Sequence, residues 1–259
     1  MNPGYRFASL CLAFTVAAGL VPLPDPSFWV PAQPEPPPIT TPEPPADTSP
    51  EPPSLPTGDG LEDVSSTDWF YPAIRVGVRH GFIRPVEGRF EPQQSINRAA
   101  FVSMLGRMHM ALGGVVRHDH VPNLPYTDIV PHAEYLPYLA WATATEIVRG
   151  DAEQRFRPDA PITREEMAVL LARYIDAYVT HDHVPTDYYD DHNPYADWWD
   201  IAEWAHDEVH LLRALGVLQG REVEPGIYLF HPGDYVLRLE SAVVLVRLFE
   251  MIFEERGAL

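Results

Sequence analysis

Apolar residues recur three times along the chain at helical spacing. Within each set the later members follow the first by three, four, seven and eleven residues, which places all five on one face of an α-helix. The sets are Phe101, Met104, Leu105, Met108 and Leu112; Met167, Leu170, Leu171, Tyr174 and Tyr178; and Ser241, Val244, Leu245, Leu248 and Ile252. The pattern therefore predicts three equivalent helices, each with one buried face.

A fixed motif precedes each of these helices. It consists of a Phe-x-Pro segment and an arginine eight residues after the phenylalanine. The three examples are Phe90, Pro92 and Arg98; Phe156, Pro158 and Arg164; and Phe230, Pro232 and Arg238. Identical spacing in three places indicates an internal repeat, and a repeat determines the architecture of a chain.

A second helix is expected upstream of each motif. Trp69 precedes Gly81 by twelve residues, and Trp204 precedes Gly216 by the same interval. An aspartate stands before each of these helices in a capping or turn position. The aspartates are Asp63, Asp128 and Asp197. Each copy is thus predicted to be helix, loop, helix, and the fold to be all-α, with copies at 61–116, 124–180 and 193–255.

The segment before the copies does not have the composition of a folded domain. Of the 29 prolines, 15 fall between Pro22 and Pro56. We expect residues 21–60 to form a disordered, partly polyproline linker. Residues 1–20 are expected to be a signal peptide, because Arg6 precedes a short apolar run. Cleavage would leave no membrane span, whereas a retained leader would anchor the chain to a membrane.

The charge of the chain excludes several functions. The formal net charge is −19, and all 18 basic residues are arginine. Such a surface repels nucleic acid and anionic lipid headgroups, so we expect no binding of DNA or RNA. Cys11 is the only cysteine and lies in the leader, which leaves the mature protein without a disulfide, a cysteine nucleophile or a thiolate metal site.

The repeated motifs resemble those of the S-layer homology family. The pattern of that family is an Asp-Val start, a Trp-led helix, a Gly-Ile turn, Phe-x-Pro and then Ile-Thr-Arg-Ala-Glu. The middle copy, with Ile162-Thr163-Arg164-Glu165-Glu166, is the most similar. The resemblance covers residues 61–255. It implies a pseudo-threefold, mainly helical unit that binds secondary cell-wall polysaccharides in grooves between copies, often through the carboxylate of a pyruvylated sugar.

The copies depart from the family pattern at several positions. Asn97 and Ala100 replace the Thr and Glu of the motif in the first copy. Glu134 replaces the Trp in the middle copy, and Leu237 replaces the Thr in the third. One or two grooves are therefore expected to be silent, and Arg164 is the arginine that we most expect to bind a ligand.

The candidate ligand-binding residues are the motif arginines and their neighbours. Thr163 and Glu166 have capping-box spacing, which makes Arg164 the first residue of its helix. A cation there opposes the helix dipole, but a guanidinium beside unpaired helix N–H groups suits a carboxylate. Trp69 and Trp204 offer flat faces for sugar stacking. The full set is Arg164, Arg98, Arg238, Thr163, Glu166, Trp69 and Trp204.

These assignments have structural alternatives. An arginine could pair with a nearby carboxylate, such as Asp159 or Glu165, and only fix its loop. Trp69 and Trp204 could pack within their own repeats instead of contacting a sugar. The sequence alone leaves both alternatives open.

Histidine-rich segments are the remaining candidates for a functional site. His206 and His210 have the i, i+4 spacing of zinc ligands, but Asp207 stands where the metalloprotease motif requires Glu. The His-Asp-His segments at 118–120 and 181–183 could bind a metal or could simply be solvated. We predict neither a metal nor a cofactor.

The sequence thus predicts a secreted, non-catalytic protein of the cell wall or cell envelope. Its predicted partner is a polysaccharide attached to peptidoglycan, and Arg164→Ala is expected to weaken that binding. Two alternatives remain open. One is a protein–protein interaction or tether module with degenerate grooves, and the other, less favoured, is an envelope metal-dependent hydrolase. The oligomeric state is not predicted.

Overall fold

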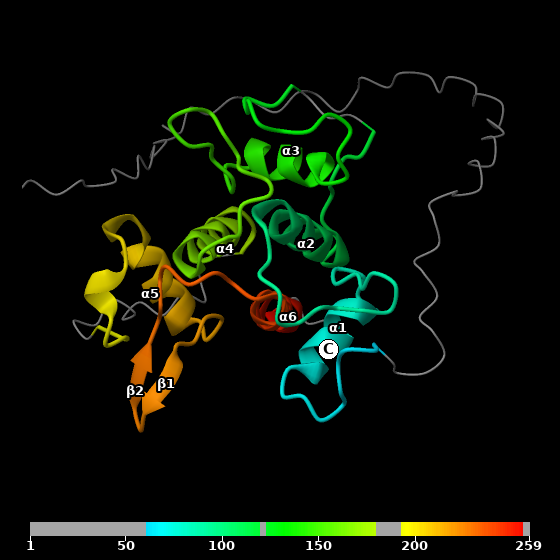
Figure 1. Ribbon diagram of the computed structural model, residues 1–259. Helices are drawn as coiled ribbons and strands as arrows, with labels where there is room; N and C mark the ends of the chain where they lie inside the picture. The colour runs from blue at the N-terminus through cyan, green and yellow to red at the C-terminus, as the bar shows by residue number, and fades with distance from the viewer. Residues whose placement is uncertain (1–60, 120–122, 180–192, 256–259) are drawn as a thin grey trace, which may run out of the picture. The chain divides into compact units, whose positions relative to one another are not determined.

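Each copy supplies two α-helices, as the hydrophobic pattern predicts. The computed structural model describes residues 61–119, 123–179 and 193–255 (Figure 1). The helices are α1 (Tyr71–Arg79) and α2 (Arg98–Ala111), α3 (Leu136–Ala144) and α4 (Arg164–Tyr178), and α5 (His206–Ala214) and α6 (Arg238–Glu255). The prediction of a mainly helical fold is confirmed. The predicted leader, linker and second His-Asp-His segment lie outside the described residues.

Short elements join the helices of the third copy. Two 3-10 turns, Trp198–Asp200 and Glu203–Ala205, precede α5. The longer loop before Phe230 contains an antiparallel hairpin, β1 (Arg221–Glu224) and β2 (Ile227–Leu229). These strands were not predicted from the sequence. They lie in the loop before Phe230, which is longer than the equivalent loops before Phe90 and Phe156.

Local sequence explains where the helices begin. Pro72 and Pro137 stand in the first turns of α1 and α3, where a missing N–H costs no helical hydrogen bond. Asn97 caps α2 by accepting from the Ala100 N–H at 2.8 Å. Thr163 and Glu166 form the predicted capping box at the start of α4. The first helices do not begin at the tryptophans, since α1 starts two residues after Trp69.

The second helix of each copy packs on the first helix of the next copy. α2 packs on α3, α4 packs on α5, and α6 packs on α1, which closes the three copies into a ring. Figure 1 shows α2, α4 and α6 at the centre with α1, α3 and α5 around them. The predicted apolar faces of the central helices are buried in this core, with Phe101, Leu171 and Leu245 completely inaccessible to solvent. This is the predicted pseudo-threefold arrangement.

Three backbone hydrogen bonds join the copies near the pseudo-threefold axis. The N–H of Ile96 donates to the carbonyl of Val236 at 2.9 Å, that of Val236 to Ile162 at 3.0 Å, and that of Ile162 to Ile96 at 3.1 Å. All three side chains are buried. Each residue lies two positions before a motif arginine, so this triangle fixes the starts of the three central helices relative to one another.

Candidate functional site: the ring of motif arginines

Each motif arginine reaches from the start of its helix to the phenylalanine of the next copy. Its Nε donates to the phenylalanine carbonyl, and its guanidinium lies over the phenylalanine ring. The donor–acceptor distances are 2.9 Å for Arg98 and Phe156, 2.7 Å for Arg164 and Phe230, and 2.7 Å for Arg238 and Phe90. The guanidinium carbon is 5.2 to 5.5 Å from the ring centroid in all three. The pair of Arg238 and Phe90 joins the third copy to the first and so closes the ring of copies.

The aspartate that opens each copy holds the phenylalanine in place. The carboxylate of Asp63 accepts from the N–H of Phe90 at 2.8 Å and from that of Glu91 at 2.6 Å. Asp128 and Asp197 do the same in their copies. The residue after each phenylalanine has a positive φ, between 56° and 58°, a region that costs energy for residues other than glycine. Of the two roles predicted for the aspartates, the structure therefore assigns the turn.

The first two N–H groups of each central helix are not open, which contradicts the expectation of unpaired N–H groups at these positions. The N–H of Arg98 donates to the carbonyl of Ala160, and that of Ala99 to Pro158, both at 3.0 Å. The loops of the neighbouring copy satisfy the equivalent groups of α4 and α6 in the same way.

Two of the three arginines are engaged in internal ion pairs. Nη1 of Arg98 lies 3.2 Å from Oε1 of Glu166, and Nη1 of Arg164 lies 3.4 Å from Oε1 of Glu240. The exposed fractions of the two arginine side chains are 9% and 4%. Burial lowers the pKa of both arginines, and the paired glutamate opposes that shift. The partner is the third residue of the next copy's helix, not Asp159 or Glu165.

Each of these glutamates binds a second arginine as well. Oε1 of Glu166 also accepts from Arg157 at 3.4 Å, and Oε1 of Glu240 accepts from Arg221 at 2.8 Å. The other oxygen of Glu166 accepts from the N–H of Thr163 at 3.1 Å. Both oxygens of the Glu166 carboxylate are therefore engaged in contacts within the protein. The interfaces at Arg98 and Arg164 are thus filled by a carboxylate of the chain itself.

Arg238 differs from the other two arginines. The position that should supply its partner is Ala100, where the family motif has Glu. In the part of the chain that the structure describes, Nε bonds to Phe90 and no partner is seen for either Nη atom. No described buried side-chain nitrogen or oxygen lacks a partner, so these Nη atoms face solvent. Burial lowers the pKa of Arg238, and the negative charges of Glu91 and Asp63 partly oppose that shift.

The candidate tryptophans are exposed. Trp69 is 69% exposed, and among the described residues its ring makes an edge contact with Phe70 alone, with the centroids 5.7 Å apart. Trp204 is 55% exposed. Packing within the repeat therefore does not account for either side chain. Trp199 is 81% exposed and was missed, although a Trp-Trp pair at 198 and 199 was a visible signal.

Sequence analysis also missed a second arginine series, nine residues after the first. Arg107 donates from Nε to the carbonyl of Phe82 at 3.2 Å, and Arg173 donates from Nη1 to that of Ile147 at 3.4 Å. These contacts attach α2 and α4 to the turns of their own copies. The constant offset to Arg247 in the third copy was the available signal.

The proposed zinc pair packs around an aromatic ring. The rings of His206 and His210 lie 4.6 and 5.2 Å from that of Trp198, and Nε2 of His206 is 3.0 Å from the carbonyl of Ile201. Among the described residues no group of three potential metal-binding side chains is found. No helix of the described part is long and apolar enough to span a membrane.

Comparisons with known proteins agree with the repeat pattern. Residues 61–102 and 125–168, which lie in the first two copies, match the S-layer homology domain. The chain is 24% identical over 192 residues to cell surface glycoprotein 1 of Acetivibrio thermocellus, covering 73% of this chain and 8% of that protein. Exoglucanase XynX of the same organism is 25% identical over 71% of this chain and 16% of its own length.

A further relative is a surface-layer protein. The surface-layer 125 kDa protein of Lysinibacillus sphaericus is 27% identical over 120 residues, which cover 45% of this chain and 10% of that protein. The chain thus spans less than a fifth of the length of these relatives.

Proposed function

We propose that the chain is a non-catalytic envelope module that binds a cell-wall polysaccharide at Arg238. The ligand group is an anionic substituent, such as the carboxylate of a pyruvylated sugar. The observation that supports this assignment is the pair of solvent-facing Nη atoms of Arg238, which have no carboxylate partner in the described part of the chain. Residues 193–255, which make the same contacts as the matched copies, are part of the proposal as a diverged third S-layer homology repeat.

The geometry of Arg238 suits a carboxylate. Its Nε is fixed on the Phe90 carbonyl, and its guanidinium lies over the Phe90 ring. The two Nη atoms therefore have a defined direction, and a guanidinium so held can donate two parallel hydrogen bonds to one carboxylate. Ala100 occupies the position of the competing glutamate and carries no charge. Trp69 precedes α1, which packs on α6, and offers an exposed aromatic face for a sugar ring.

Arg98 and Arg164 are poorer candidates than the sequence suggests. A ligand carboxylate would have to displace Glu166 or Glu240, each of which is held by two arginines and a backbone N–H. Breaking a buried ion pair without replacing it costs about 3–5 kcal/mol. We therefore infer that these two interfaces are structural and that the groove between the third and first copies is the active one.

One assay tests this function. The full chain is sedimented with purified wall sacculi before and after removal of the attached polysaccharide, alongside Arg238→Ala and Arg164→Ala. We expect binding to require the polysaccharide, to be lost with Arg238→Ala, and to persist in the folded fraction of Arg164→Ala. Arg149→Ala, at an exposed ion pair with Glu146, is the matched control. Binding that survives in Arg238→Ala would overturn the assignment.

A second candidate function is a protein-interaction or tether module with degenerate grooves. The observation in its favour is that internal carboxylates occupy two of the three equivalent positions. Binding to sacculi that is unaffected by stripping the polysaccharide would support it. A chelator-sensitive turnover of wall material would instead indicate an enzyme.

A further inference from the structure

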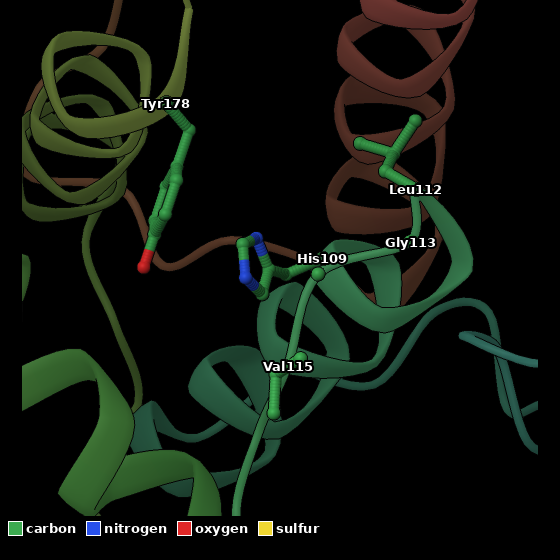
Figure 2. Close-up of a pocket in the computed structure, with 6 residues that line it drawn as sticks. His109, Leu112, Gly113, Val115 and Tyr178 are labelled. Carbon is green, nitrogen blue, oxygen red and sulfur yellow. The ribbon is translucent and has the colours of Figure 1, made fainter. Parts of the chain in front are cut away.

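We propose a second binding pocket, for an uncharged sugar ring, where α2 and α4 end. The pocket has a volume of about 410 Å³ and is lined by His109, Leu112, Gly113, Gly114, Val115 and Tyr178 (Figure 2). This volume lies within the range of about 300–1,000 Å³ that is usual for small-ligand sites. The motif arginines stand at the opposite ends of the same helices, so the pocket is separate from the proposed anion site.

The internal repeat provides a comparison for the residues around the pocket. At the interface of the first and second copies, four side chains with polar atoms meet: His109, Trp141, Tyr174 and Tyr178. The equivalent positions at the next interface are Ile175, Leu211, Leu248 and Ile252, and at the last they are Phe249, Val76, Met108 and Leu112. Apolar side chains therefore fill the equivalent positions at both of the other interfaces. The polar aromatic set is not required by the architecture, and another role accounts for it.

The aromatic set holds the pocket's polar atoms in fixed positions. The ring centroid of His109 lies 4.9 Å from that of Trp141 and 4.3 Å from that of Tyr178. The indole N–H of Trp141 donates to the hydroxyl of Tyr178 at 2.9 Å. Because that oxygen accepts from the indole, the phenol keeps its own proton to donate. Figure 2 shows the side chains of His109 and Tyr178 next to each other, from two different central helices.

The glycine turn after α2 forms the other wall. Gly113 has a φ of 84°, which a glycine adopts without strain. A Cβ atom added at Gly114 would overlap the imidazole of His109, so only glycine lets the backbone lie directly on that ring. Val115, 74% exposed, stands at the mouth. The N–H groups of Gly113 and Gly114 donate to the carbonyls of Met110 and His109, so the turn brings the glycine carbonyls to a pocket that already has an aromatic side.

The chemistry of the lining indicates the class of ligand. None of the six described lining residues is Asp, Glu or Arg, so His109 is the one ionisable side chain besides the phenol among them, and a cation would enter without a counter-charge from these residues, which is costly. An apolar surface from Tyr178, Leu112 and Val115 combines with a phenol donor and glycine backbone groups. A neutral pyranose has the matching form, with an apolar face and hydroxyl groups at its edge. An aromatic peptide side chain would leave the phenol proton without an acceptor.

The test uses the full chain and a panel of neutral sugars. N-acetylglucosamine, N-acetylmannosamine and glucose are titrated while the tryptophan fluorescence and the imidazole NMR signals of His109 are followed. We expect saturable shifts with at least one sugar. Tyr178→Phe should raise Kd by about 3- to 10-fold, the effect of one neutral hydrogen bond. Val115→Phe should abolish binding, because it fills the mouth from an exposed position and need not disturb the core.

The controls separate this pocket from the arginine site. Val130→Phe alters another exposed valine, 56% accessible and absent from the pocket lining, and should leave the titration unchanged, as should Arg238→Ala. Shifts that disappear in Arg238→Ala but persist in Val115→Phe would place the sugar in the other groove and overturn the proposal. The absence of a saturable response to all three sugars, or a response only to a phenylalanine- or tryptophan-containing peptide, would also overturn it.

Discussion

The three motif arginines show how one side chain can have two roles in one molecule. Arg98, Arg164 and Arg238 make the same bond to a phenylalanine carbonyl, so each closes one interface of the ring. They differ in the third residue of the facing helix, which is Glu166, Glu240 or Ala100. A glutamate there makes the arginine structural, and an alanine leaves its Nη atoms available. Ala100, which the sequence alone indicated as a defect of the first copy, thus marks the groove that we propose to be active.

Ala100→Glu should convert the open groove into a closed one. The new carboxylate would stand where Glu166 stands opposite Arg98, and it would pair with Arg238. We expect wall binding to fall at least tenfold, while the free energy of unfolding stays equal or rises by up to about 1 kcal/mol, the usual value of a partly exposed ion pair. Sedimentation and urea unfolding measure the two effects. Ala100→Gln, which fills the same space without the charge, is the control and should reduce binding less.

Arg164→Ala should mainly reduce stability. The substitution leaves the Phe230 carbonyl without its donor and deprives Glu240 of one of its two arginines. Because the Arg164 side chain is only 4% exposed, we expect a loss of about 3 kcal/mol, at the low end for a broken buried pair. Urea unfolding of Arg155→Ala, which removes exposed ion pairs with Asp151 and Glu153, should show a clearly smaller loss, because solvent screens exposed pairs. Equal stability of the two variants would contradict a structural role for Arg164.

At the scale of elements, the sequence predicts what lies within a copy and misses what lies between copies. The helical faces and the capping box of Thr163 follow from local spacing, and the structure confirms both. The hydrogen bonds at the helix starts could not be predicted in this way. Their acceptors, such as Ala160 for Arg98, lie on a loop of the next copy. Local spacing therefore indicated open N–H groups at positions where the tertiary structure supplies an acceptor.

The turn after each phenylalanine depends on its aspartate. Asp128 accepts from the N–H groups of Phe156 and Arg157, and Arg157 has a φ of 58°. Asp128→Ala would leave two N–H groups without their acceptor in a strained turn. We expect a loss of about 2–3 kcal/mol in the free energy of unfolding, because each lost acceptor costs about 1 kcal/mol and the charge adds to it. Denaturant titration measures the loss.

Two further variants separate the causes. Asp128→Asn retains one acceptor oxygen and should recover part of the loss. Arg157→Gly should relieve the left-handed strain, so its combination with Asp128→Ala should unfold at a higher denaturant concentration than Asp128→Ala alone. If all three variants unfold at the midpoint of the unaltered protein, the aspartate does not hold the turn.

At the scale of the whole molecule, the ring makes the copies interdependent. Arg238 bonds to Phe90 across 148 residues of sequence, and α6 packs on α1. Open repeat arrays gain stability copy by copy, because each unit contacts only its neighbours. Here the last copy is also a neighbour of the first. The threefold repeat was visible in the sequence, but the closing contact was implied only by the family resemblance, because no local pattern identifies the partner of α1.

Removing the third copy should therefore unfold part of the first. In a chain ended after residue 192, α1 loses α6, the Phe90 carbonyl loses Arg238, and the N–H of Ile96 loses the carbonyl of Val236. In the full chain we expect the amides of Ile96, Ile162 and Val236 to exchange with solvent only through global unfolding. In the shortened chain, the amides of α1 and Ile96 should lose most of their protection, although the deleted residues lie about a hundred positions away. Hydrogen exchange followed by NMR measures both. Full protection of α1 in the shortened chain would show that the copies form an open stack, because a closed ring transmits the loss of any one copy to both of its neighbours.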